Sequence, residues 1–275
     1  MKRAIILSLL TLAVSACDRA APPGTPAPSA TSATVTPTTA DAMPNGEAGL
    51  EDLVESTSDY VIGISYPPVA AQHPGLAAEL QRYADAARAE LLAAVQAREP
   101  DGDGAMYDLS LAFTEVLDTP EVVAIAADGS SYTGGAHGMP LLARFVWLPR
   151  QERMLKATDL IRDPAGWQAV ATHVREQLHT ALSQRVDADQ VEPGERAELV
   201  GNAGRMIDEG TRPDPANFSQ FEPVAAPDGK LSALRFVFAP YQVGPYSDGV
   251  QTVQVPASVL LPHIAPDYRG LFQGA

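Results

Sequence analysis

The sequence predicts an α+β fold in which two long helices pack on a largely antiparallel sheet. Segments with the period of two that is typical of strands lie toward both ends of the chain, and two long segments with a helical period lie among them. Strand and helix do not alternate regularly, as they would in a parallel sheet. With 275 residues, of which 45% are hydrophobic, the chain can bury a sizeable core. We expect two small subdomains, at 48–150 and 151–275, that share the sheet.

The first subdomain is expected to begin with a strand at 59–66, where alternate residues are apolar. A helix then runs from His73-Pro74 to about Arg98, with an apolar stripe along one face. The stripe consists of Leu76, Leu80, Tyr83, Ala87, Leu91 and Val95. Further strands are predicted at 106–117, 121–127, 141–148 and 153–158, with turns at 101–104, 118–120 and 149–152. The continuous apolar character of 141–148 predicts a buried strand.

In the second subdomain, after the strand at 153–158, a long helix is expected to begin at Asp163, because Asp is a good N-cap and Pro164 suits the first helical position. Its buried face is predicted to contain Trp167, Val170, Val174, Leu178 and Ala181. A more polar helix is predicted at 195–209. Strands at 217–224 and 231–239 flank a Pro-Asp-Gly-Lys hairpin turn, and a loop at 241–249, a strand at 250–255 and a short helix at 257–264 complete the chain.

The N-terminus resembles a bacterial lipoprotein signal. Lys2 and Arg3 precede an apolar segment, and small residues lead to Cys17, the one cysteine of the chain. We therefore expect a signal peptide at 1–17 with Cys17 lipidated; the alternative is an ordinary signal peptide cut near Ala16. Residues 18–47, rich in Pro, Ala and Thr, predict a disordered tether. These features predict a membrane-anchored lipoprotein of the cell envelope that faces the periplasm, and Asp18 after the cysteine favours the inner membrane.

The chain is strongly acidic, which restricts its partners. The formal net charge is −15, and it becomes −17 when Lys2 and Arg3 leave with the leader. Such a chain repels nucleic acid, so no nucleic-acid partner is expected, and it attracts basic proteins. The alternative reading is that the acidity only keeps the domain soluble.

The segment Tyr132-Thr-Gly-Gly-Ala-His-Gly138 is the most specific in the chain. The residues Tyr132, Gly134, Gly135, His137 and Gly138 lie here between two predicted strands. Glycines permit positive φ, and their amides could bind an anion. His137 could act as a base or a ligand. The alternative is a tight connection in which His137 bonds to the backbone.

A second unusual loop carries Tyr241 and Tyr246 on a frame of glycine and proline. Exposed tyrosines of this kind make good contact residues, and the alternative is that both rings pack on the edge of the sheet. Elsewhere the sequence has no Gly-x-Ser-x-Gly, zinc spacing, dinucleotide fingerprint or P-loop. No catalytic residue is therefore assigned, and no metal or cofactor is expected.

Together with 156–161, the two loops carry a family resemblance. The segments 132–138 and Phe236-x-Phe-x-Pro-Tyr-Gln-Val-Gly-Pro-Tyr246, followed by Gly249 and Val253-x-Val-Pro256, resemble the paired envelope domains of unknown function found in two kinds of protein. One is the extracellular half of lysozyme-sensing anti-sigma factors of the RsiV type. The other is the N-terminal module of peptidoglycan deacetylases of the PdaC type. The resemblance implies an α+β binding or sensing module. The chain departs from both relatives, with neither a sigma-binding segment nor a deacetylase domain.

These observations favour a lipid-anchored envelope binding module. It would recognise a basic, lysozyme-like protein or a cell-wall component such as peptidoglycan, through the surface around His137, Tyr241 and Tyr246. One alternative is a deacetylase-like enzyme that acts on cell-wall glycan with His137 as its base. Another is a structural envelope lipoprotein without a ligand.

Overall fold

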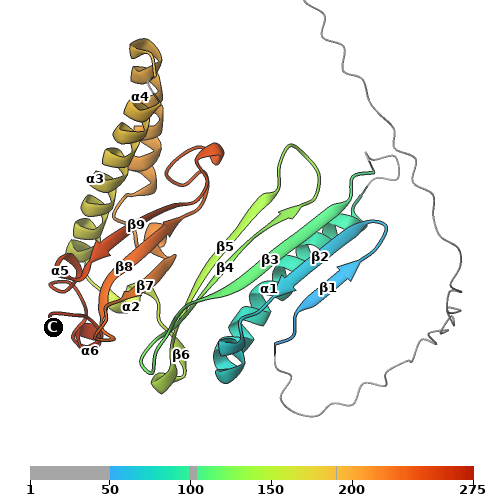
Figure 1. Cartoon of the computed structure of the whole chain (residues 1–275), viewed down its shortest axis with the longest axis horizontal. Helices are drawn as coiled ribbons and strands as arrows, with labels where there is room; N and C mark the ends of the chain where they lie inside the picture. Colours follow the sequence, from blue (N-terminus) through green and yellow to red (C-terminus); the bar gives the residue numbers. More distant parts are fainter. Residues whose placement is uncertain (1–49, 99–103, 190) are drawn as a thin grey trace, which may run out of the picture. The chain divides into compact units, whose positions relative to one another are not determined.

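The computed structural model of the chain describes residues 50–98, 104–189 and 191–275. The predicted signal peptide with Cys17, the tether at 18–47 and most of the predicted turn at 101–104 lie outside these described residues. Six strands form the first sheet, in the order β1-β2-β3-β4-β5-β6 (Figure 1). They are β1 (Leu53–Ser56), β2 (Tyr60–Ser65), β3 (Tyr107–Asp118), β4 (Val123–Tyr132), β5 (Met139–Leu148) and β6 (Arg153–Met154).

All neighbours in this sheet are antiparallel except β2 and β3, which are parallel. A parallel pair needs a long crossover, and helix α1 (Pro74–Gln96) supplies it. Strands β7 (Phe221–Ala225), β8 (Leu231–Phe238) and β9 (Gln251–Pro256) form a second, antiparallel sheet. The remaining helices are α2 (Ala157–Leu160), α3 (Pro164–Ala188), α4 (Pro193–Gly210), α5 (Ala257–Leu260) and α6 (Pro266–Arg269), with 3-10 turns η1 (Pro68–Gln72), η2 (Pro149–Gln151), η3 (Pro215–Phe218) and η4 (Tyr246–Asp248).

The predicted α+β class with a largely antiparallel sheet is confirmed, but the expectation that both halves share one sheet is wrong. Strand β6 is only two residues long, so the edge that it forms offers little backbone for a further strand to pair with. Strand β7 instead packs against β3, β4 and β5 and starts a sheet of its own.

One face of the first sheet packs against α1. Of the stripe predicted for this helix, Leu76, Leu80, Ala87 and Leu91 are buried, whereas Tyr83 and Val95 are half-buried. The Tyr83 ring lies edge-on to Phe113 and Phe145, at centroid distances of 6.3 and 5.8 Å. Burial, aided by the charge of Asp128, raises the pKa of Tyr83. Its hydroxyl therefore stays neutral to a higher pH than that of an exposed tyrosine.

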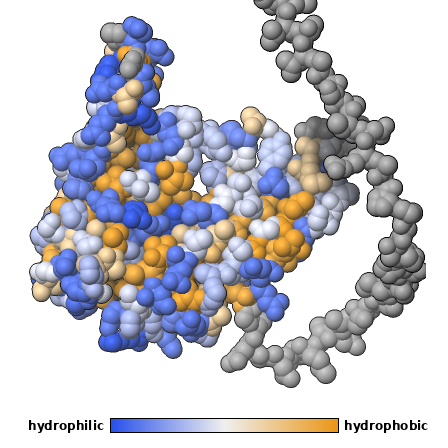
Figure 2. All heavy atoms as spheres, in the orientation of Figure 1, coloured by the Kyte–Doolittle hydropathy of each residue, from blue (hydrophilic) through white to orange (hydrophobic). Residues whose placement is uncertain are grey.

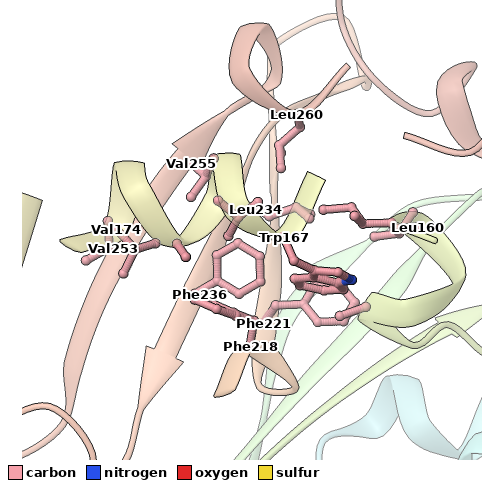
Figure 3. Packing of buried hydrophobic residues seen from close by; sticks show 14 of the residues in the cluster. Leu160, Trp167, Val174, Phe218, Phe221, Leu234, Phe236, Val253, Val255 and Leu260 are labelled. Atoms are coloured by element: carbon pink, nitrogen blue, oxygen red, sulfur yellow. The ribbon is translucent and has the colours of Figure 1, made fainter. Parts of the chain in front are cut away.

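A second core joins α3 to the second sheet (Figure 3). Trp167 stacks on Phe218 at 5.9 Å, and Phe218 meets Phe236 edge-on at 5.4 Å. Asp163 caps α3 as predicted, because its carboxylate accepts a hydrogen bond from the Gly166 amide at 2.7 Å. The predicted buried face is right for its first four members: Trp167, Val170, Val174 and Leu178.

The prediction that Ala181 is buried is wrong. Ala181 is exposed, and Leu182 is buried in its place. Leu182 lies four residues after Leu178, so it falls on the same stripe of the helix. The larger side chain also gains more by burial, because the free energy of burial grows with apolar area.

The strands of the first sheet differ from prediction at four places. The strand predicted at 153–158 ends at Met154 as β6, and helix α2 begins at Ala157. Strand β1 was not predicted; its alternation is too short to detect, and Val54 is exposed. Strand β5 was expected to be buried, yet only Phe145 to Leu148 are. Strand β4 continues to Tyr132 instead of ending at 127. Gly129 permits this extension, because a Cβ there would lie 2.0 Å from the Ser110 carbonyl oxygen on β3.

A buried ion pair connects the two sheets. Arg144 on β5 and Glu222 on β7 have side chains only 6% and 10% exposed, and Arg144 Nε donates to Glu222 Oε1 at 2.6 Å. Arg144 also pairs with Asp128, and Arg235 on β8 pairs with the second oxygen of Glu222. The Arg144 amide donates to the Gln220 side chain at 2.8 Å. Both charges are thus satisfied where β7 meets the first sheet.

Removing one member of this pair should destabilise the protein. We expect Arg144→Met to lower the free energy of unfolding by about 3 kcal/mol, because Glu222 would stay buried with half of its partners. The matched change Arg150→Met removes an exposed pair with Glu121, at 72% and 47% exposure, and should cost less than about 1 kcal/mol. Urea denaturation of both variants compares the two. Equal losses would contradict a structural role for the buried pair.

The close approach of β3 and β4 can be tested with two glycines of the same sheet. Gly129→Ala should cost about 1–3 kcal/mol, because the new methyl would overlap the Ser110 backbone. Gly63→Ala should leave stability unchanged or raise it by up to about 1 kcal/mol, because no atom lies within 4 Å of the added Cβ. Thermal unfolding of the pair measures the difference, and a tolerated Gly129→Ala would disprove the close contact.

Candidate functional site

The two loops singled out in the sequence meet in the structure. One connects β4 to β5 and carries His137, and the other connects β8 to β9 and carries Tyr241 and Tyr246 (Figure 1). The imidazole of His137 stacks on the Tyr246 ring, with centroids 4.1 Å apart and an interplanar angle of 19°. Tyr241 lies 6.5 Å from His137 and 5.6 Å from Tyr246. We call these three side chains the aromatic surface.

Hydrogen bonds set the tautomer of His137. Its Nδ1 lies 3.1 Å from the Gly138 carbonyl oxygen, which can only accept, so Nδ1 carries the proton. In the neutral ring Nε2 is then an acceptor, and the Tyr241 hydroxyl lies 3.4 Å from it. The Tyr246 hydroxyl donates to the same Gly138 carbonyl at 3.2 Å. Each ring of the surface is therefore held by at least one bond across or within the loops.

The remaining residues of the predicted motif shape the β4–β5 loop. Gly134 and Gly135 have φ of 100° and 96°, a region that residues with a Cβ rarely adopt. The hydroxyl of Tyr132, the last residue of β4, donates to the Gly135 carbonyl at 3.1 Å. All seven predicted contact residues thus lie in or beside these two loops. Four of them touch across the loops, namely His137, Gly138, Tyr241 and Tyr246.

The β8–β9 loop is held in place by contacts that the sequence analysis did not predict. Val243 is buried in the second core. A Cβ on Gly210, the last residue of α4, would lie 2.0 Å from the Gln242 carbonyl oxygen, so the backbones touch there. The Gln242 side chain donates to the Asn217 carbonyl at 2.9 Å. Gly210 is the last residue of α4, and a glycine is common at the end of a helix. Nothing in the sequence therefore marked it as a contact.

The surface is exposed where a partner could reach it. Tyr241 is 56% exposed and adopts a positive φ of 71°, which is uncommon for a tyrosine. Met139, next to Gly138, is 64% exposed. The prediction that both tyrosines stand on a glycine and proline frame as contact residues is compatible with this geometry. The alternative, in which both rings pack on a sheet edge, fits Tyr241 poorly.

Among the described residues, the His137 ring has no carboxylate partner. The hydrogen-bond partners of His137 within the described residues are a backbone carbonyl and a phenol, and neither is a carboxylate that would orient a catalytic base. Across the described ranges, no group of three or more His, Cys, Asp or Glu side chains is arranged to hold a metal ion. No helix among those ranges combines the length and the apolar character that crossing a membrane requires.

Comparison with known proteins gives information on the fold and none on the function. No protein-family model and no curated protein matches the sequence. The crystal structure of a DUF3298 family protein from Pseudomonas aeruginosa PAO1 is similar, with a TM-score of 0.50 and 16% identity over 82% of this chain and 96% of that chain. A DUF3298 family member from Bacteroides fragilis NCTC 9343 gives a TM-score of 0.46 with the same identity and coverage. The structural neighbours therefore belong to a family of unknown function, and the similarity concerns the fold alone.

The contact between Gly210 and Gln242 should control the aromatic surface. In Gly210→Ala the added methyl must displace the β8–β9 loop, so we expect the His137–Tyr246 stacking to be lost. Nuclear Overhauser contacts between the two rings report the stacking directly. Gly201→Ala on the same helix is the control: its Cβ would meet only Arg205 at 4.0 Å, and it should stabilise α4 by up to about 1 kcal/mol. Intact ring contacts in Gly210→Ala would contradict this dependence.

Proposed function

We propose that this protein is a binding module of the cell envelope, and that it recognises a basic protein through the aromatic surface. The observation that carries the proposal is the meeting of His137, Tyr241 and Tyr246 from two separate loops, with Tyr241 left 56% exposed. Aromatic side chains held in a defined orientation lose little conformational entropy on binding and dominate the energy of many interfaces.

The charge of the chain supports a basic partner. Acidic residues number 34 against 19 basic ones. Most arginines of the described part are already paired with carboxylates, for example Arg88 with Glu55 and Arg185 with Asp248. The surplus therefore consists of carboxylates that face solvent. Such a field attracts a basic protein and raises the rate of encounter, while the aromatic contacts supply affinity at short range.

The proposed setting follows from the N-terminal sequence. Lipidation at Cys17 would anchor the chain to a membrane facing the periplasm, with Asp18 favouring the inner membrane, and residues 18–47 would act as the tether. About 30 residues of flexible chain reach roughly 30 Å. The folded part would thus meet large partners away from the lipid surface.

There are two alternatives that involve a cell-wall glycan. In one the protein binds the glycan, and in the other it is an enzyme that acts on it. Stacked rings can bind sugars, so peptidoglycan belongs in any binding assay. The enzyme reading needs His137 as a base, and the contacts of its ring with Gly138 and Tyr241 do not prepare it for that role. A basic protein therefore has the stronger support.

The proposal is tested by titrating the full chain with hen lysozyme in a calorimeter, at low and at moderate salt. Tyr241→Ala should weaken binding about tenfold or more if the aromatic surface is the contact. The control Val54→Ala changes a residue that is 81% exposed on β1 and should leave binding unaltered. Complete loss of wild-type binding at moderate salt would mean that only opposite charges attract, and would overturn the proposal.

A further inference from the structure

A pocket lies beside the β8–β9 loop, next to the aromatic surface. It is a pocket of ≈ 460 Å³ between α3, α4 and the turn η4. This volume falls within the range of sites that bind small molecules or side chains, about 300–1,000 Å³. The pocket is lined by Arg185, Val186, Asp189, Leu199, Asn202, Ala203, Met206, Pro245, Ser247 and Asp248. It therefore shares the segment 245–248 with the loop that presents Tyr246 to His137.

The lining is divided between an apolar floor and a polar rim. Val186 and Ala203 are buried at the floor, and Leu199 and Met206 are half-buried beside them. At the rim, Arg185 is neutralised by Asp248, with their nitrogen and oxygen 2.8 Å apart. An apolar floor of this kind favours a hydrocarbon side chain over a polar ligand.

The surroundings of the pocket are acidic. Exposed carboxylates crowd the end of the hairpin formed by α3 and α4. They are Asp187, Asp189, Glu192, Glu195 and Glu198. Arg196 pairs with Asp187, whereas Asp189 has no ion pair among the described residues. Figure 2 shows a mainly hydrophilic surface over this end of α3 and α4. The local charge thus complements a partner with lysines or arginines beside its apolar anchor.

We infer that this pocket is a second subsite, which takes an apolar side chain flanked by basic residues on the same partner. The inference rests on the proposed function and specifies the partner's chemistry. The segment 245–248 separates the two sites. Tyr246 belongs to the aromatic surface, while Pro245, Ser247 and Asp248 line the pocket. A partner that covers the aromatic surface and reaches over this segment would place a side chain in the pocket. The occupant is therefore an aliphatic side chain in a cationic segment.

The test uses two short synthetic peptides, Lys-Lys-Leu-Lys-Lys and Lys-Lys-Gly-Lys-Lys, both with blocked ends. They carry the same charge and differ only in the central side chain. Burial of a leucine side chain should make the first peptide bind the full chain about tenfold more tightly. In nuclear magnetic resonance spectra its addition should shift the amide signals of Val186, Ala203 and Ser247. Equal binding of the two peptides would overturn the inference.

Two variants localise the effect. Ser247→Trp places a large ring at the mouth of the pocket and should abolish the preference for the leucine peptide. Ala197→Trp puts the same ring on an exposed position of α4 that does not line the pocket, and the preference should persist. Circular dichroism checks that both variants fold. A preference retained in Ser247→Trp would also overturn the inference.

The outcomes separate this inference from the proposed function. The peptide comparison does not involve Tyr241, so Tyr241→Ala should weaken lysozyme binding and leave the peptide preference intact. Lysozyme binding that depends on Tyr241, together with equal binding of the two peptides, would leave the proposed function standing and remove the pocket from it. A leucine preference without any lysozyme binding would support the subsite and overturn the proposed function.

Discussion

The ion pair between Arg144 and Glu222 is the constraint on which the arrangement of the two sheets depends. A buried charge is tolerated only where its partner and its hydrogen bonds are in place. Displacing β7 relative to the first sheet would separate Glu222 from Arg144 and leave both side chains buried without this partner. The Gln220 side chain accepts a hydrogen bond from the Arg144 backbone amide, which adds a second contact between the same two segments.

The aromatic surface depends on how the two sheets are placed against each other. His137 and Tyr241 are separated by 104 residues in the chain, and they meet because the two sheets are held at one position against each other. Positive φ at Gly134 and Gly135 shapes the β4–β5 loop locally. The β8–β9 loop is positioned by a long-range contact, that of Gln242 with Gly210 on α4. A rigid composite surface of this kind is suited to recognition, because little order has to be gained on binding.

Charge and aromatic contacts act at different distances in the function that we propose. The acidic surface attracts a basic partner over roughly a Debye length, about 8–10 Å at physiological salt, whereas the rings act only in contact. An acidic field alone would bind any basic protein. The combination of the aromatic surface with the neighbouring pocket would select partners that carry an apolar anchor among their basic residues.

Most of the local structure could be predicted from the order of the residues. Proline and aspartate signals placed the start of α3 correctly, and the helical period placed α1. A polar helix was predicted where α4 lies, and the two unusual loops contained the residues that meet. These features depend on neighbours within a few residues of each other, which a pattern records. Even here the burial of Leu182 in place of Ala181 was missed, because both positions lie next to the same stripe of the helix and packing decides between them.

Three features could not be predicted and are set by the packing of the whole fold: the parallel pairing of β2 with β3, the separation into two sheets and the contact of Gly210 with the β8–β9 loop. Each depends on groups far apart in the chain, whose proximity follows from packing and from the pairing of buried charges. The three aromatic side chains of the candidate site could be picked out in the sequence, but their contact with one another depends on the fold.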